Sequence, residues 1–228
     1  MVLHQRLEEV ESRIARAAQR LGRRREDITL IAVTKVFPAS VIRGAFALGV
    51  RHFGENYVQE FEGKFPEVSD LAGAHFHLVG HLQSNKAKRA VQLFDAIDTV
   101  DSVRLARRLE EAPPELHRRA GTRIQVMLEV KLSEEEAKRG AGPEDLPALI
   151  EALGNARQLE LTGLMTMPPW SQDPEQSRPY FRHLRELAER FRLPHLSMGM
   201  SHDLEVAIEE GATQVRVGAA LFGPRKEA

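Results

Sequence analysis

The 228-residue sequence contains no cysteine, which excludes disulfide bonds, thiolate nucleophiles and cysteine metal sites. It also lacks an apolar run near the ~20 residues that a membrane span requires, and its amphipathic first segment, MVLHQRLEEVESRIARAAQRLG, is not a signal peptide. The formal net charge of −1 provides no basic excess for nucleic acid. We therefore expect a cytoplasmic protein whose partners include neither a membrane nor a nucleic acid.

Strand-like segments and helical patterns alternate along the chain. Strands are expected at 28–34, 51–54, 75–79, 95–100, 123–130, 159–165, 195–199 and 214–218. Helices are expected between them at 39–49, 56–65, 84–93, 102–111, 143–153, 174–192 and 202–210, with an extra N-terminal helix at 3–21. Eight strands in this rhythm favour a (β/α)8 barrel over an open doubly wound sheet. No linker divides the chain, so 1–228 is expected to form a single domain.

A lysine follows the first of these strands, in the stretch ITLIAVTKVFP at 28–38. Active sites of such barrels lie at the C-terminal ends of the strands. Strand alternation places Ile31, Val33 and Lys35 on one face, which would bring the amine of Lys35 to this rim. Two interpretations remain open, because the amine could simply extend into water or could act chemically in a site.

Two small, glycine-containing loops end the seventh and eighth strands. In SMGMSHD, Gly199 and Ser201 precede a helix expected to begin near His202, and Ser201 is the expected N-cap. In VRVGAALFG, Gly218 and Ala219 form a second loop beside it. Free backbone amides at such positions bind phosphate, and barrels often hold a phosphate after these two strands. An ordinary cap and a tight turn would explain the same residues.

Arg216 lies inside the eighth strand and is expected to point into the mouth of the barrel. A buried guanidinium needs an acceptor, which could be a heteroaromatic nitrogen, a ligand carboxylate or a glutamate of the rim. A lysine amine, a phosphate cradle and a buried arginine together suit pyridoxal 5′-phosphate (PLP), an aldehyde with a phosphate arm and a pyridine nitrogen.

A metal-dependent barrel hydrolase is a rival interpretation. The segment HFHLVGHLQSNK contains His75, His77 and His81, and a His-x-His pair at a strand end is typical of metal sites. Further ligands at the other strand ends are few, with Asp98, Asp101 and His202-Asp203 the nearest candidates. We therefore expect no metal, and we expect His77 to be packed or hydrogen-bonded inside the barrel.

Six motifs, in order, resemble the YggS/PROSC-type PLP-binding proteins, also called PLP homeostasis proteins. They are AVTK (32–35), FGENYVQE (53–60), HLVGHLQSNK (77–86), GLMTM (163–167), SMGMSHD (197–203) and VRVGAALFGPR (215–225). The resemblance spans nearly the whole chain. It implies a barrel of the alanine-racemase N-terminal domain type (PLP fold type III) that holds the cofactor without an established reaction. It also implies a role in PLP homeostasis and delivery, with apo PLP-dependent enzymes as recipients.

The resemblance also assigns roles to residues. It implies that Lys35 is the lysine that forms the internal aldimine and that Arg216 is the partner of the pyridine nitrogen. The implied phosphate clamp comprises Gly199, Met200, Ser201, Gly218 and Ala219, and the implied pocket walls are Asn56 and Met165. The family often has a second lysine two residues after the first, whereas this chain has Phe37 at that position. A cofactor-relay role for such a lysine is therefore not expected here.

A low-activity PLP enzyme, such as an amino-acid racemase, is the other alternative. Alanine racemases resemble this barrel and add a C-terminal β-domain that supplies a catalytic tyrosine, and we expect no such domain after LFGPR. Two-base racemisation needs groups on both faces of the substrate, and this chain has only Tyr57 and Tyr180 as tyrosines. We therefore expect a non-catalytic carrier of PLP. A monomer is expected, because the site is complete within one chain.

Overall fold

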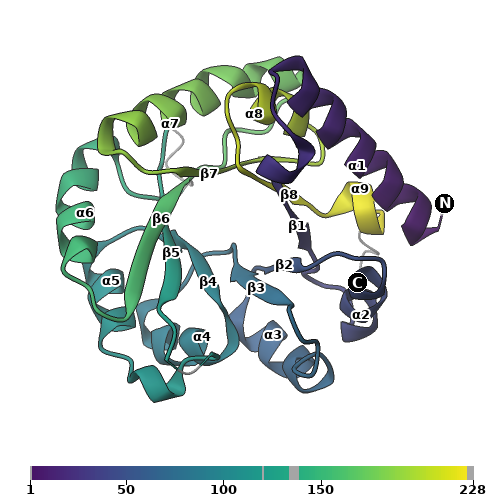
Figure 1. Ribbon diagram of the computed structural model, residues 1–228. Coiled ribbons are helices and arrows are strands. Elements are labelled where there is room, and N and C mark those ends of the chain that lie inside the picture. The colour runs from purple at the N-terminus through teal and green to yellow at the C-terminus, as the bar shows by residue number, and fades with distance from the viewer. Residues whose placement is uncertain (1, 120, 134–138, 225–228) are drawn as a thin grey trace.

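The computed structural model describes residues 2–119, 121–133 and 139–224. Eight parallel strands close into a barrel in chain order, because β1 pairs with both β2 and β8 (Figure 1). The strands are β1 Thr29–Val33, β2 His52–Glu55, β3 His75–Leu78, β4 Ala96–Val100, β5 Ile124–Glu129, β6 Leu159–Met165, β7 His195–Met200 and β8 Gln214–Val217. The predicted barrel is confirmed, and each strand lies within two residues of its expected bounds.

A ring of helices surrounds the barrel, as Figure 1 shows. They are α1 Leu3–Arg20, α2 Ala39–Ala47, α3 Val58–Lys64, α4 Ala87–Leu93, α5 Val103–Glu110, α6 Leu146–Gly154, α7 Arg178–Phe191, α8 Leu204–Glu209 and α9 Ala219–Phe222. The extra N-terminal helix is confirmed as α1. Three expected helices begin instead with a 3-10 turn, at Ser84–Lys86, Pro143–Asp145 and Pro174–Ser177. The four-residue α9 was not predicted, since it is too short to show a helical period.

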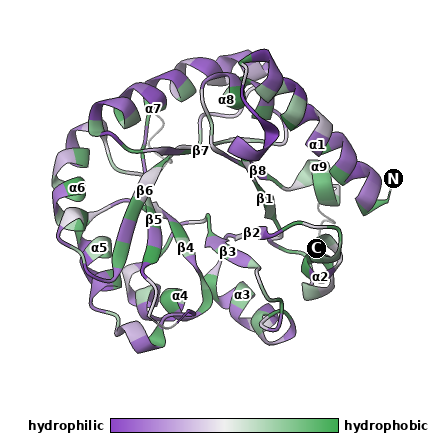
Figure 2. Ribbon diagram, in the orientation of Figure 1, coloured by the Kyte–Doolittle hydropathy of each residue, from purple (hydrophilic) through white to green (hydrophobic). Residues whose placement is uncertain are grey.

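The hydrophobic core lies between the sheet and the helices. Strand residues that point outward, such as Leu30, Phe53 and Val215, pack there against the apolar stripes of the helices. Purple and green residues accordingly alternate along α1 and α7 in Figure 2. On α1 the stripe includes Leu7, Val10 and Ile14 and covers α8 and α9. Burying one such aliphatic side chain stabilises the fold by about 1.5–3 kcal/mol.

Polar side chains of β2, β3 and β4 meet inside the barrel. His52 Nδ1 lies 2.9 Å from His77 Nε2, and the rings of His52 and His75 stack at 4.9 Å. His77 is buried and also faces the carboxylate of Asp98. Burial, together with the neighbouring His77 and His75, lowers the pKa of His52 to about 3. His77 is thus hydrogen-bonded inside the barrel, as expected from the sequence.

Metal-ligand geometry is absent among these side chains. Within the described residues, no group of three or more His, Cys, Asp or Glu side chains is arranged to hold a metal ion. The histidines of β2 and β3 contact one another instead.

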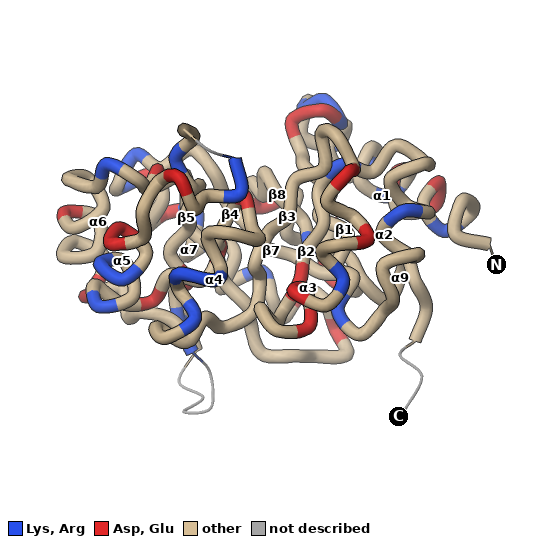
Figure 3. The backbone as a smooth tube through the Cα atoms, turned by 90° about the horizontal axis from the view of Figure 1, so that it is seen from below, with Lys and Arg blue, Asp and Glu red and all other residues tan. Residues whose placement is uncertain are grey.

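Charges of both signs are mixed over the outer helices in Figure 3. Among residues 2–119, 121–133 and 139–224, no helix combines the length and the apolar character needed to span a bilayer.

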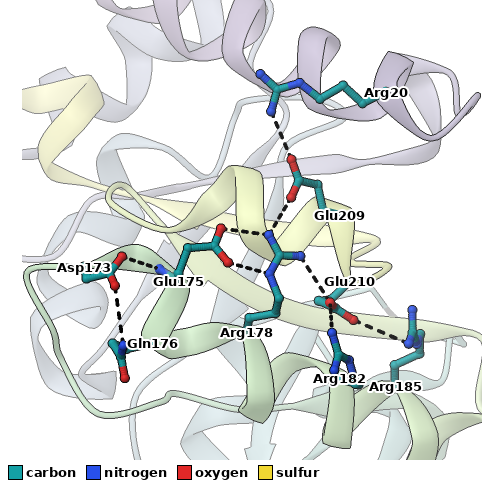
Figure 4. Close-up of polar contacts among 9 residues, drawn as sticks. All are labelled: Arg20, Asp173, Glu175, Gln176, Arg178, Arg182, Arg185, Glu209 and Glu210. Carbon is teal, nitrogen blue, oxygen red and sulfur yellow. Dashed lines mark hydrogen bonds and ion pairs between the residues drawn. The ribbon is translucent and has the colours of Figure 1, made fainter.

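An ion-pair cluster around Arg178 holds the start of α7 against α8 (Figure 4). The Arg178 guanidinium contacts Glu175 at 2.6 Å, Glu209 at 2.7 Å and Glu210 at 3.2 Å. Glu209 also pairs with Arg20 of α1 at 3.0 Å. This cluster therefore joins three helices next to the segment that connects β6 to α7. It explains how a segment with little secondary structure keeps a defined place near the barrel rim.

Candidate functional site

A pocket of about 390 Å³ opens at the C-terminal ends of the strands. Seven of the residues predicted for the site line it: Lys35, Asn56, Met200, Ser201, Arg216, Gly218 and Ala219. Two predicted residues lie elsewhere. Met165 is fully buried on β6, and Gly199 (φ +89°) approaches α8 so closely that a Cβ would lie 2.4 Å from Ala207 Cβ. The structure therefore brings together the predicted lysine, arginine and both phosphate-type loops.

Lys35 stands two residues beyond the end of β1. Val33 and Lys35 both line the pocket, so the face predicted from alternation is the face that enters the site. The next residue, Val36, has φ +62°, a left-handed conformation that is unfavourable for a β-branched side chain. Such backbone strain costs about 1–3 kcal/mol and persists only where neighbouring contacts impose it. After it, the ring of Phe37 packs against Phe222 of α9 at 5.5 Å.

Arg216 is buried on β8, with 4% of its surface exposed. Its Nη1 donates to Ser197 Oγ at 2.7 Å and its Nη2 donates to the Thr166 carbonyl at 2.9 Å. Burial lowers its pKa, and nearby carboxylates, Asp98 first, oppose that effect. The partners are thus a hydroxyl and a carbonyl rather than a rim glutamate. Since a guanidinium carries five N–H donors, it can still donate to a ligand in the pocket.

The loops after β7 and β8 contact each other, because the Ala220 amide donates to Ser201 Oγ at 3.2 Å. The prediction that Ser201 caps a helix is wrong. A turn at 201–203 delays α8 to Leu204, and Asp203 precedes the helix instead. Asp203 Oδ1 accepts from the Met200 amide at 2.7 Å and Oδ2 accepts from Ser177 Oγ at 2.8 Å. Ser201 therefore faces the pocket, next to the first turn of α9.

Sequence reasoning missed a whole wall of the pocket. The segment between β6 and α7 contributes Met167, Pro169, Trp170 and Ser171. The Trp170 side chain is 75% exposed, and its ring lies 6.5 Å from that of His202. No periodic pattern marks this segment, and the Pro168-Pro169 pair indicates only a loop. The remaining unpredicted lining residues are Val33, Val79, Ser177, His202 and Asp203.

Close packing also places Asn56. A Cβ on Gly80 would lie 2.3 Å from the carbonyl oxygen of Asn56, so only glycine fits there. The loop after β2 is thereby held against the loop after β3, with Asn56 at the edge of the pocket.

The groups in the pocket match one kind of ligand. An amine can bond an aldehyde, a buried guanidinium can donate to a heteroaromatic nitrogen, and a hydroxyl beside backbone amides can hold a phosphate. Lys35, Arg216 and Ser201 with Gly218 and Ala219 provide these three functions within one cavity. The chemical groups that line the pocket thus fit the aldehyde, the ring nitrogen and the phosphate of PLP.

Fold and pocket together define a class of PLP-type barrel, and the comparison with known proteins agrees. The model of the family "Alanine racemase, N-terminal domain" matches residues 6–226. Pyridoxal phosphate homeostasis protein of Pseudomonas aeruginosa is 45% identical over 95% of this chain and 93% of its own. The Aquifex aeolicus protein of the same name is 42% identical over 97% and 98%, respectively.

Solved structures lead to the same group. The structure of PipY from Synechococcus elongatus PCC7942 with PLP bound is 40% identical, with a TM-score of 0.83, and the match covers 97% of this chain and 100% of that one. This chain belongs to the family of pyridoxal phosphate homeostasis proteins.

Below the pocket, Glu129 at the end of β5 is a buried carboxylate. It is 3% exposed, and its Oε2 has no hydrogen-bond partner among the described residues. Burial, assisted by the charge of Asp101, raises its pKa to about 7, although Arg216 and Arg139 favour the ionised form. In the unfolded chain this carboxyl would have an ordinary pKa near 4.5.

We predict that Glu129 makes the cofactor-free protein less stable as the pH rises. The folded state binds the proton of Glu129 more tightly than the unfolded state does. Its contribution to the free energy of unfolding is therefore complete below about pH 4.5 and decreases by up to about 3 kcal/mol as the pH rises through 7. Glu129→Gln should therefore match the wild type in urea unfolding at pH 5 and exceed it at pH 8. Glu160→Gln, which changes an exposed carboxylate on β6, is the control. Parallel pH curves for wild type and Glu129→Gln would contradict the prediction.

Proposed function

We propose that this chain holds PLP through a covalent bond to Lys35 and acts in intracellular PLP homeostasis by storing and delivering the cofactor. The observation that carries the proposal is the convergence of Lys35, Arg216 and Ser201 on one pocket. The names of the relatives and the PLP-bound PipY structure support it.

Each residue has a separate task in this proposal. The Lys35 amine would condense with the aldehyde and release its oxygen as water, and the Ser201 hydroxyl and the amides of Gly218 and Ala219 would bind the phosphate. Arg216 donates to the ring nitrogen, and Asn56 borders the ring. When bound, PLP supplies an electron sink that depends on a protonated ring nitrogen. Because a guanidinium only donates, Arg216 keeps that nitrogen unprotonated and weakens the sink.

Racemisation would also require a second proton-transfer group opposite Lys35. Apart from Lys35, the pocket is lined by two titratable side chains that could move a proton, His202 and Asp203. His202 Nε2 lies 2.9 Å from the Gln172 carbonyl, and both oxygens of Asp203 accept protein hydrogen bonds. The bonds to Asp203 oppose its use as a second base, whereas His202 donates through Nε2 and keeps Nδ1 as an acceptor, so its role has to be tested. Because Arg216 weakens the electron sink, we propose a carrier rather than an enzyme.

Borohydride reduction of the PLP-loaded protein should fix a pyridoxyl group on Lys35, as found by peptide mass mapping. The visible absorption band should shift on reduction. Lys35→Ala should lose both the band and the label, whereas Lys88→Ala, at an exposed lysine on α4, should keep them. An equal label on another lysine in Lys35→Ala protein would refute the assignment.

A weak racemase is separated from a carrier by incubating the PLP-loaded protein with single amino acids in deuterated water. We expect the absorption spectrum of the cofactor to change as the amino acid replaces Lys35 on it. We expect no deuterium at the α-carbon beyond that given by free PLP. His202→Gln is the matched variant, because a second-base role for His202 predicts that its loss abolishes exchange. Catalytic α-deuteration that depends on His202 would establish the enzyme interpretation.

We further propose that the protein acts in the reducing cytoplasm as a single-domain monomer and passes PLP to apo PLP-dependent enzymes. The site uses residues of one chain, and the sequence has no cysteine. Light scattering should give the monomer mass of 25.6 kDa.

Mixing the loaded protein with an apo PLP enzyme should restore that enzyme's activity, while Lys35→Ala protein treated in the same way should restore none. A loaded protein that retains its cofactor throughout would exclude delivery.

A further inference from the structure

Two side chains of α3 hold the peptide groups on either side of Lys35. The Thr34 carbonyl, in the peptide before Lys35, accepts from Lys64 Nζ at 3.0 Å. The Val36 amide, in the peptide after it, donates to Glu60 Oε1 at 2.6 Å. The orientations of these two peptide planes set φ and ψ of Lys35. They therefore also set the direction in which its side chain leaves the backbone.

The two holding groups belong to one buried charge cluster. Lys64 Nζ lies 2.6 Å from Glu60 Oε1 and 2.9 and 3.1 Å from the two oxygens of Glu55. Glu55 also accepts from Thr34 Oγ1 at 2.7 Å. Thr34 and Glu55 are fully buried, and the Lys64 side chain is 11% exposed. The ammonium of Lys64 thus fixes both carboxylates and one of the two peptide groups directly.

Val36 has a strained conformation in the turn that follows Lys35. Its side chain is 56% exposed, so packing of the side chain does not explain its positive φ of 62°. A β-turn does, because the Phe37 amide donates to the Thr34 carbonyl at 3.1 Å and places Val36 at the third turn position, where φ is positive in type II turns. The hydrogen bond from the Val36 amide to Glu60 holds the peptide plane between Lys35 and Val36 in this turn. Strained backbone of this kind is found where the position of a nearby functional group matters.

We propose that Lys64, acting through Glu55 and Glu60, is a positioning residue that holds the backbone of Lys35 so that its amine enters the cofactor pocket. The proposal rests on the proposed function in one respect, because it takes Lys35 as the residue that bonds PLP. No contact between the cluster and the cofactor is required.

A purely stabilising ion pair is the competing explanation, and the chain contains a matched control. At the other end of the barrel, Arg118 pairs with Asp95 at 2.5 Å, with side chains 10% and 8% exposed. Asp95 also accepts from the backbone amide of Phe76 at 2.8 Å. Arg118→Met therefore breaks a comparably buried pair away from the pocket, and Asp95 keeps its contact with Arg119 at 2.7 Å.

The first measurement uses cofactor-free protein and hydrogen exchange at the Val36 amide. Glu60→Ala should accelerate this exchange roughly tenfold to a hundredfold, the worth of a hydrogen bond to a charged group. Lys64→Met should also accelerate it, because Glu60 loses the ammonium that fixes its carboxylate. Glu60→Gln retains an acceptor for the amide but loses the charge, so its exchange should lie between that of wild type and that of Glu60→Ala. Arg118→Met should leave exchange at Val36 unchanged.

The second measurement follows PLP capture by stopped-flow absorbance, together with the circular dichroism of the bound cofactor. Lys64→Met and Glu60→Ala should capture PLP roughly tenfold or more slowly and change the dichroism, because the amine is no longer aimed at the aldehyde. Glu60→Gln should restore both signals, and Arg118→Met should lower the melting temperature without altering either. If Lys64→Met does not fold, the Glu60 variants decide, since that side chain is 26% exposed.

Two failures can be told apart. In the first case, the pyridoxyl label of the wild type lies on Lys35, but Lys64→Met and Glu60→Ala show wild-type exchange at the Val36 amide and wild-type rates of PLP capture. The positioning role is then overturned and the proposed function stands. If wild-type PLP maps to another lysine, the proposed function fails, and the positioning role fails with it even where the exchange data show that the backbone is held.

Discussion

The pairing of β1 with β8 is the constraint on which the site depends. Ile31 of β1 pairs with Arg216 of β8 in the closed barrel, although the two residues are 185 positions apart in the sequence. That register carries Lys35, beyond the end of β1, and Gly218, beyond the end of β8, to the same pocket. An open sheet would leave the amine and the phosphate loop on opposite edges.

Alternation of apolar strands with amphipathic helices was enough to predict eight strands, their order and the rim on which Lys35 and Arg216 meet. The errors arose where contacts distant in sequence decide the local structure. Ser201 has the side chain of an N-cap, but Asp203 bonds the Met200 amide and takes the position before α8. Similarly, the stretch 166–173 shows no hydrophobic period. Its place depends on the segment that follows it, which ion pairs between Arg178 and the end of α8 hold.

The cluster around Lys64 was beyond sequence reasoning for a related reason. In isolation, Glu60 and Lys64 form an ordinary i,i+4 pair on a helix surface, which is worth only about 0.3–0.5 kcal/mol. Their importance comes from Glu55, contributed by β2, and from the two peptide groups beside Lys35. A pattern confined to α3 cannot reveal that its charges face the end of β1. Gly80 is also explained only by the folded structure, because the carbonyl oxygen of Asn56 leaves no space for a Cβ at that position.

Holding a cofactor and turning over a substrate make different demands on the same pocket. Capture is favoured when the amine is already oriented, because less conformational freedom is lost on bonding. The strained turn at Val36 and the bond from Glu60 provide that orientation in the folded chain itself. Turnover would further require a second proton-transfer group and a protonated ring nitrogen, whereas Asp203 is engaged by protein donors and Arg216 can only donate. On the proposed function, an oriented Lys35 in a pocket that disfavours carbanion chemistry would bond and release PLP rather than turn over a substrate.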